Sequence, residues 1–369
     1  MLSLTYSLAD QNFLTTKSVG IFNLSCQLLE RLARRPEVQA LTVLANATLE
    51  GRLSLPATVE WQRHDTAIRG RLQRMLWDQW GVYRAARRTS HEWLFLPKGF
   101  ASFVAACPAR LGLYVHDTML DFYASQYPAG FSRMESWYFR QCFRANLRQA
   151  AVLFTNSDFT RFEIERVARR DRLPMPPAAT IGIGFTPPGR FPAKRDLILV
   201  PVSRYPHKRS DLAVAWMDRW QQREGGTAEV HWVGSFPERL EVPQRPAWRC
   251  HRRLEEGDYR ALVEAARVLV FFSEYEGFGM PPVEVALAGG CPVYSDIPVT
   301  REVMAGAGYA FANDDFESFC HAMNRALAAT AGQREAWADE LARRHNWDQV
   351  CEKAITAWSE PAAATRGRS

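Results

Sequence analysis

Hydrophobic and polar positions follow two alternating periods along the chain. Short β-branched and aromatic runs end in polar residues or glycine, and each is followed by a longer stretch in which apolar residues recur every three or four positions. The short runs predict buried strands and the longer stretches predict amphipathic helices. The strand candidates are Leu41–Ala45, Trp93–Leu96, Leu111–Val115, Val152–Thr155, Leu197–Val202, Val230–Val233, Val268–Phe272 and Pro292–Tyr294.

The order of these elements predicts an α/β fold. Strands separated by helices need crossover connections, which build parallel sheets with helices on both faces. A length of 369 residues leaves room for two or three domains. Residues 173–195 hold six prolines and three glycines, so we expect the linker between two doubly wound domains there. Ligands of such sheets bind at the carboxyl ends of the strands, which predicts a cleft between the domains.

Composition indicates a folded protein. Hydrophobic residues make up 47% and charged residues 23% of the chain, as in ordinary globular proteins. No apolar run approaches the ~20 residues that cross a bilayer, and residues 1–10 lack the features of an export signal, so we expect a cytoplasmic location. The seven cysteines are scattered, which predicts reduced core residues and no zinc site or disulfide framework.

The net charge of +6 is concentrated in one segment, because residues 61–90 hold seven arginines and two aspartates. A helix over Arg69–Arg88 would place one apolar stripe between arginines. Either the stripe packs on the first domain and the arginines are solvated, or the segment contacts an anionic membrane through its arginines, with Trp77, which lies off the stripe, among the headgroups. Arginines interleaved with aromatic residues also suggest a nucleic-acid binder, but no binding module is recognisable and we expect no nucleic acid. The stripe consists of Leu72, Met75, Leu76, Trp80 and Tyr83.

The stretch from Ser273 to Pro292 has the pattern strand, tight loop, helix, turn and strand. Gly277 and Gly279 remove side chains from the loop, and Pro281 suits the first turn of a helix. The free N–H groups and positive dipole of such a helix start favour a phosphate. We therefore predict a cradle for a diphosphate.

Two carboxylates bracket this loop: Glu276 at the strand exit and Glu284, which we expect in the first helical turn. A carboxylate can accept two hydrogen bonds from a vicinal diol, so one could bind a ribose and the other a sugar ring. The alternative is structural: Glu284 complements the helix dipole and Glu276 is a solvated loop charge.

The run Glu276-Gly-Phe-Gly-Met-Pro-Pro-Val-Glu284 resembles the E-x7-E motif of family 4 of the retaining glycosyltransferases. The resemblance implies the GT-B fold, with two doubly wound Rossmann-like domains that face a central cleft. It implies that Glu276 acts on the transferred sugar and that Glu284 binds the nucleotide. The loop residues implied to hold the donor are Gly277, Phe278, Gly279 and Met280.

Three further segments are similar to parts of that family. Val202–Arg209 resembles the segment whose Arg and Lys neutralise the donor diphosphate, which implies Arg204 and Lys208. The segment is one residue shorter than usual, so Arg209 is an alternative to Lys208. Tyr114–Asp117 resembles a strand end whose histidine, here His116, contacts the transferring sugar. Residues 17–21 stand where a glycine-rich turn is expected, and Gly20 could contact an anion through its backbone.

The resemblance implies the domain roles. Residues 1–180 would bind the acceptor, 181–345 would bind the nucleotide-sugar donor, and 346–369 would form a helix that crosses back to the first domain, followed by a tail. No Asp-x-Asp occurs in the chain, so we expect no metal and no other cofactor. Retention would come from front-face attack, in which the acceptor hydroxyl passes its proton to the departing phosphate oxygen.

The implied function is transfer of a hexose from a nucleoside-diphosphate sugar to a glycan or lipid-linked oligosaccharide, as in the synthesis of bacterial surface polysaccharide such as lipopolysaccharide. The histidine–aspartate strand end favours a GDP sugar, either mannose or a deoxyhexose such as rhamnose. A lipid-linked acceptor would suit a peripheral site on the inner face of the cytoplasmic membrane, reached through residues 61–90. The alternatives are a UDP-sugar donor, a sugar-nucleotide-binding protein without activity, and an epimerase of the same fold.

Overall fold

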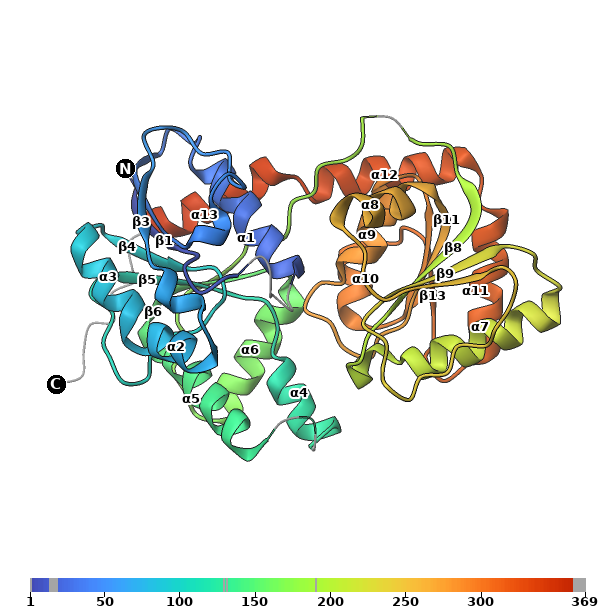
Figure 1. The fold of residues 1–369 in the computed structure, drawn as a ribbon, viewed down its shortest axis with the longest axis horizontal. Coiled ribbons are helices and arrows are strands. Elements are labelled where there is room, and N and C mark those ends of the chain that lie inside the picture. The colour runs from blue at the N-terminus through green and yellow to red at the C-terminus, as the bar shows by residue number, and fades with distance from the viewer. Residues whose placement is uncertain (1, 13–18, 129, 131, 190, 361–369) are drawn as a thin grey trace. The chain divides into compact units, whose positions relative to one another are not determined.

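The computed structural model describes residues 2–12, 19–128, 130, 132–189 and 191–360. The chain divides into two compact units (Figure 1). Unit 1 comprises Met1–Gly184 and Trp347–Ser369, and unit 2 comprises Phe185–Asn346. The units divide a few residues beyond the boundaries that we expected at positions 180 and 345.

Unit 1 contains a seven-stranded parallel sheet with the order β3-β2-β1-β4-β5-β6-β7. All four strand candidates of the first half of the chain are confirmed. The sequence pattern missed β1, because this central strand carries the polar residues Thr5 and Ser7, which are buried. The strands are β1 (Leu2–Ser7), β2 (Val38–Ala45), β3 (Glu60–Arg63), β4 (Trp93–Leu96), β5 (Arg110–Val115), β6 (Ala150–Thr155) and β7 (Ala178–Thr180).

The last helix of the chain completes the core of unit 1. The ring of Trp358 lies 5.2 Å from that of Phe95 and 4.9 Å from that of Phe154. Gly112 leaves room for it, since a Cβ at Gly112 would lie 2.9 Å from Nε1 of Trp358. The helices of unit 1 are α1 (Val19–Leu32), α2 (Arg71–Leu76), α3 (Val82–Thr89), α4 (Met119–Gln126), α5 (Arg133–Gln149), α6 (Asp158–Arg170) and α13 (Trp347–Ser359).

The basic segment differs from its prediction. A π-helical turn (Trp77–Gly81) interrupts the expected helix between α2 and α3, and its extra residue rotates the faces on either side. Trp77 is buried, whereas Leu72 and Trp80 are 72% and 52% exposed. Of the stripe, Tyr83 is buried and Met75 half-buried, whereas Leu72, Leu76 and Trp80 are exposed, so most of the stripe does not pack on unit 1. The expected place of Trp77 among headgroups is wrong.

Buried hydrogen bonds hold the π turn in place. The Nε2 of Gln79 donates to the hydroxyl of Tyr138 at 3.2 Å, and its Oε1 accepts from the backbone of Phe103 at 3.0 Å. A polar side chain that is buried must find such partners. The turn thus points Gln79 and Trp77 inward, which leaves Leu76 and Trp80 outside.

Unit 2 contains a six-stranded parallel sheet with the order β10-β9-β8-β11-β12-β13. The four strand candidates of the second half are confirmed, and with them the α/β class of both units. The pattern missed the edge strands β10 and β13, which are short. The strands are β8 (Arg195–Val202), β9 (Glu229–Gly234), β10 (Trp248–His251), β11 (Ala266–Phe271), β12 (Cys291–Ser295) and β13 (Tyr309–Phe311).

The helices of unit 2 cover both faces of this sheet (Figure 1). One core cluster packs the sheet against α7 and α11 through large side chains such as Trp220, Trp232, Phe272 and Phe319. Burial of this apolar area is the main stabilising contribution to the unit. The helices are α7 (Ser210–Glu224), α8 (Glu256–Ala265), α9 (Met280–Leu287), α10 (Pro298–Met304), α11 (Phe316–Ala328) and α12 (Ala331–Arg344).

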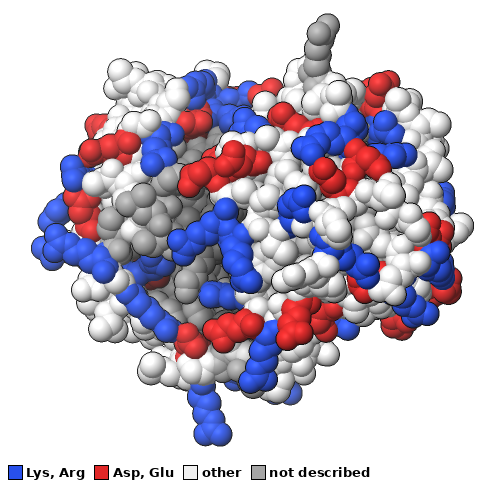
Figure 2. All heavy atoms as spheres, turned by 45° about the vertical axis from the view of Figure 1, so that its right-hand side comes forward, with Lys and Arg blue, Asp and Glu red and all other residues white. Residues whose placement is uncertain are grey.

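Surface properties refine two expectations. All seven cysteines are free, but Cys250 is exposed, so the prediction of a core position is wrong for it. Figure 2 shows Lys and Arg interspersed with Asp and Glu on the face that it draws. Across the residues that the structure describes, no helix is both long enough and apolar enough to span a membrane.

Candidate functional site

The loops that follow β8, β11 and β12 meet at one edge of the sheet of unit 2, because parallel strands end at the same edge. The backbone N–H of Glu274, after β11, donates to the carbonyl of His207, after β8, at 2.8 Å. The N–H of Ser273 donates to Oγ of Ser295, the last residue of β12, at 2.9 Å. These bonds fix three loops against one another.

The structure brings two of the predicted residues into direct contact. The ammonium group of Lys208 forms an ion pair with Glu276, which is 8% exposed. The same ammonium group lies 5.0 Å from the centre of the Phe271 ring. The carboxylate of Glu276 is largely shielded from water, so its pairing with Lys208 gives both charges a defined place at the sheet edge.

The two remaining cations lie beside this pair. Nη1 of Arg209 lies 2.6 Å from Oε1 of Glu274, so Lys208 and Arg209 each have a carboxylate of their own. Arg204 is exposed and its guanidinium lies over the ring of Tyr205, 5.2 Å from the ring centre. Arg204 is therefore the cation that reaches farthest into solvent.

The helix predicted to bind phosphate begins where expected, at Met280. Gly279 caps the helix with a φ of 83°, a left-handed backbone conformation that is strained for residues with a side chain. Pro281 lies in the first turn of the helix. Gly277 is buried. Phe278 packs its ring on Phe185 and His345, at 6.1 and 5.3 Å, so only its backbone is available to a ligand.

Glu284 does not lie in the first turn of this helix. It is the fifth residue of α9, so the prediction of a first-turn position is wrong, as is the idea that it complements the helix dipole. Its Oε2 accepts a hydrogen bond from the hydroxyl of Tyr259 in α8 at 2.9 Å. Burial raises the pKa of Glu284. Sequence reasoning missed Tyr259, because a tyrosine in an amphipathic helix carries no signal of such a contact.

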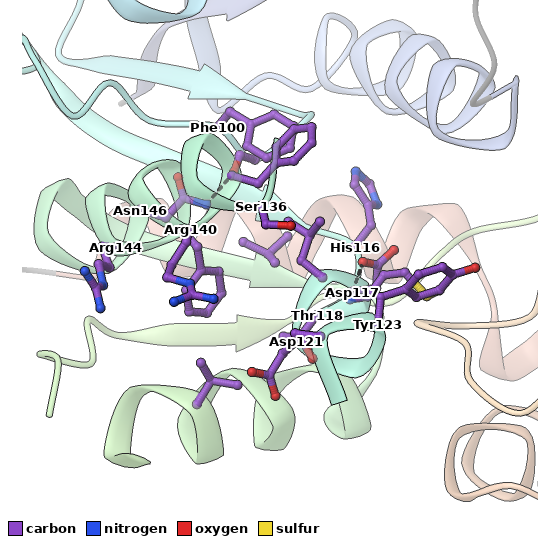
Figure 3. A pocket seen from close by; sticks show the side chains of 18 of the residues that line it. Phe100, His116, Asp117, Thr118, Asp121, Tyr123, Ser136, Arg140, Arg144 and Asn146 are labelled. Carbon is purple, nitrogen blue, oxygen red and sulfur yellow. Dashed lines mark hydrogen bonds between the residues drawn. The ribbon is translucent and has the colours of Figure 1, made fainter. Parts of the chain in front are cut away.

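Unit 1 has its own cavity of about 630 Å³ at the carboxyl ends of β4 and β5. Figure 3 shows His116, Asp117 and Tyr123 on one side of it and Arg140 and Arg144 of α5 on the other. Of the residues predicted for the site, only His116 lines this cavity. Asp117 and several others that line it directly follow His116, but no sequence pattern predicted that α5 lies beside this strand end.

His116 is held as a neutral acceptor. Its Nε2 lies 2.6 Å from the carbonyl oxygen of Pro97, so this nitrogen carries the proton. Burial lowers the pKa of the imidazole from 6.5 to about 4. At neutral pH the other ring nitrogen, Nδ1, can therefore only accept a hydrogen bond.

This shift predicts a pH dependence of stability. Between pH 6.5 and about pH 4 the unfolded His116 takes up a proton and the folded one does not, so the free energy of unfolding falls as the pH falls. The slope should be at most about 1.4 kcal/mol per pH unit. Chemical unfolding at pH 7, 6, 5 and 4.5 measures it, and His116→Asn should flatten the curve in this window. An equal slope in the variant would show that His116 is charged when folded.

Two charged side chains that line the cavity are held in ion pairs, and one guanidinium nitrogen in its wall has no hydrogen-bond partner among the described residues. Nζ of Lys98 lies 2.7 Å from Oδ2 of Asp10, and Asp121 pairs with Arg166 at 2.8 Å. Nε of Arg144 is buried without a hydrogen-bond partner within the described part of the chain.

Gly20 lies in the first turn of α1 and is exposed, and the next residue, Ile21, lines the cavity of unit 1. Lys17 and Ser18 lie outside the described residues. No group of three or more His, Cys, Asp or Glu side chains that could hold a metal ion occurs in the described ranges.

Comparison with known proteins agrees with this geometry. Residues 196–329, which make up most of unit 2, match the family model described as glycosyl transferases group 1. A stretch of 108 residues is 31% identical to the serotype-specific mannosyltransferase WbdA of Escherichia coli, and covers 29% of this chain and 13% of that protein. The O-antigen chain mannosyltransferase B of Escherichia coli is 25% identical over 261 residues, with 60% of this chain and 64% of that protein covered.

The likeness of the fold extends over both units. The crystal structure of Anabaena Alr3699/HepE in complex with UDP and glucose superposes with a TM-score of 0.67, at 15% identity, over 97% of this chain and 100% of that one. The chain therefore has the GT-B fold that the resemblance implied.

Proposed function

We propose that this protein is a retaining, metal-independent glycosyltransferase. It moves a hexose, with mannose or a deoxyhexose favoured, from a GDP sugar to a glycan or lipid-linked acceptor in the synthesis of surface polysaccharide. The observation that carries the proposal is the Lys208–Glu276 ion pair at the sheet edge where α9 begins, within a group 1 glycosyltransferase domain.

Four side chains of unit 2 and the start of α9 have defined roles in this proposal. The diphosphate binds at the start of α9, where unpaired N–H groups, Lys208 and Arg204 offset its charge. Glu284, held by Tyr259, accepts hydrogen bonds from the ribose hydroxyls. Glu276 accepts hydrogen bonds from hydroxyls of the transferred sugar.

The reaction needs no separate base. The acceptor oxygen forms a bond to the anomeric carbon on the face from which the phosphate oxygen departs, and the acceptor proton passes to that phosphate oxygen. Lys208 and the helix start stabilise the negative charge that develops on the leaving diphosphate.

The cavity of unit 1 supports a glycan as the acceptor. Its walls include Phe100, Tyr123 and Phe139, whose faces can stack on sugar rings. His116 offers Nδ1 as an acceptor, and the side chains of Arg140 and Arg144 line the cavity as well. This mixture of aromatic faces and polar groups matches a carbohydrate better than an apolar ligand.

Two observations bear on the donor. The names of the partial relatives, both mannosyltransferases, support a mannose donor. The structural neighbour in complex with UDP and glucose supports a UDP sugar as the second candidate. Turnover assays with GDP-mannose, GDP-rhamnose and UDP-glucose, with release of the nucleotide as the readout, decide between them.

Metal removal and product stereochemistry test the reaction class. We expect 10 mM EDTA to leave the rate with the best donor within about twofold, because Lys208 and the helix start take the role of a metal. The glycosidic product should keep the anomeric configuration of the donor when followed by NMR. An inverted product, or a rate that returns only with added Mg²⁺ or Mn²⁺, would refute this mechanism.

The Glu284–Tyr259 contact gives a binding prediction. Glu284→Ala should weaken the binding of the free nucleoside diphosphate by roughly 1.5 to 3 kcal/mol, as for hydrogen bonds to a charged group. Tyr259→Phe should weaken it by a smaller amount, about 1 kcal/mol, because the carboxylate stays but loses its anchor. Calorimetry measures both. Unchanged affinity in Glu284→Ala would remove this residue from the nucleotide site.

A further inference from the structure

Unit 1 has a patch of exposed apolar side chains on three segments. Ten large hydrophobic side chains are exposed among the described residues, and six of them lie here. The π turn leaves three of them outside, and the start of α5 supplies two that are 74% and 55% exposed. We call the six the apolar patch: Leu72, Leu76, Trp80, Val104, Met134 and Trp137.

The three segments are neighbours in space. Arg71 of α2 pairs with Glu135 of α5 at 2.8 Å. The rings of Phe103, beside Val104, and Trp137 lie 5.7 Å apart. Gln79 of the π turn bonds to Tyr138 of α5 and to the backbone of Phe103. The patch is therefore one surface rather than scattered single residues, which matters because isolated exposed apolar residues are common.

The segments that carry this patch also carry exposed arginines. Leu72, Leu76 and Trp80 follow one another every four residues, and the same spacing continues to Arg84 and Arg88. Among the acidic residues of these segments, Glu135 is already paired with Arg71. We call the following exposed residues the arginine fringe: Arg69, Arg71, Arg84, Arg87, Arg88, Arg133 and Arg140.

We propose that the apolar patch and the arginine fringe dock unit 1 on an anionic phospholipid membrane. Leucine, methionine and tryptophan side chains can enter the boundary between headgroups and acyl chains, and arginines bind the phosphates there. Charge complementarity selects this partner, because an apolar surface on segments that carry seven exposed arginines fits an anionic lipid layer. The surface is the reverse of the one expected from the sequence, since Trp77 lies inside and Trp80 outside.

The position of α5 links docking to the cavity of unit 1. Met134 and Trp137 belong to the patch, while Ser136 and Phe139 of the same helix line the cavity. A docked unit 1 would thus hold its cavity close to the lipid surface, where the sugar of a lipid-linked acceptor lies. This surface goes beyond the proposed transferase activity, and docking does not depend on turnover.

Co-sedimentation of the full chain with vesicles tests the proposal. Vesicles of phosphatidylglycerol and phosphatidylcholine are compared with pure phosphatidylcholine at 50 and 500 mM NaCl. We expect wild type to sediment with the anionic vesicles at low salt only, since exposed charges are screened at high salt. Leu72→Ser, Leu76→Ser and Trp80→Ser together should weaken this binding at least about tenfold. Arg84→Gln with Arg87→Gln should weaken it about 30-fold.

Matched variants elsewhere serve as controls. Phe162→Ser removes an equally exposed aromatic ring on α6, and Arg260→Gln with Arg343→Gln removes two exposed arginines of unit 2. Both controls should bind vesicles like wild type. All patch variants should keep the thermal transition of wild type and their turnover of soluble donor, which separates docking from the transferase activity.

Three results would overturn the proposal. They are a wild type that ignores anionic vesicles, a triple serine variant that sediments like wild type, and binding that resists 500 mM NaCl. Sedimentation velocity without lipid tests whether a second copy of the chain binds to the patch instead. A dimer that the triple serine variant dissociates would assign the patch to self-association instead.

Discussion

Replacement of Glu276 by glutamine should lower kcat by about 100-fold or more, while the Kd for the free nucleoside diphosphate changes by less than about threefold. The amide keeps the shape of the side chain but loses its charge. A contact to the transferred sugar strengthens as positive charge develops on that sugar, so its loss affects the transition state more than the ground state. Lys208 and the start of α9 remain in place to hold the diphosphate.

Steady-state kinetics and calorimetry on the same preparation separate the two effects. Glu274→Gln is the matched control, because Glu274 lies two residues away and is paired with Arg209 instead. We expect that control to keep kcat within about fivefold of wild type. If Glu276→Gln turns over like wild type, Glu276 has no role on the sugar. If its Kd rises as kcat falls, Glu276 binds the nucleotide rather than the sugar.

The sequence predicted those strands whose buried side chains are also apolar. β4 has the predicted bounds, because Trp93 to Leu96 are all buried and apolar. β1 was missed, although it is central, because it buries Thr5, whose hydroxyl bonds to that of Thr89 at 2.6 Å. A polar side chain satisfied by a distant partner looks like a surface residue in a periodicity pattern. The π turn was missed for a similar reason, since the partners of Gln79 lie in other segments.

The candidate site divides in the same way. Local geometry within one loop could be predicted, because glycine and proline at adjacent positions indicate the turn at Gly279 and the helix that begins after it. Contacts between separate segments could not: no pattern indicates that Tyr259 of α8 reaches Glu284 of α9, or that Lys208 rather than Arg209 pairs with Glu276. Such pairings depend on the register of β8 against β11, which only the folded sheet sets.

The Lys208–Glu276 pair predicts the largest loss. Lys208→Ala should lower kcat/KM by about 1,000-fold, because it removes two contributions at once. One is the cation that offsets the charge of the leaving diphosphate. The other is the partner of Glu276, a carboxylate only 8% exposed, which Lys208→Ala would leave without its counter-charge.

A double-variant cycle measures this coupling. If Lys208 and Glu276 act as one unit, Lys208→Ala combined with Glu276→Gln should lose little more activity than Lys208→Ala alone. Arg209→Ala is the matched comparison, because Arg209 is the neighbouring cation and has Glu274 as its own partner. We expect it to cost no more than about tenfold. Fully additive losses for Lys208 and Glu276 would mean that the two contribute separately, and a larger loss in Arg209→Ala would make Arg209 the residue that binds the diphosphate.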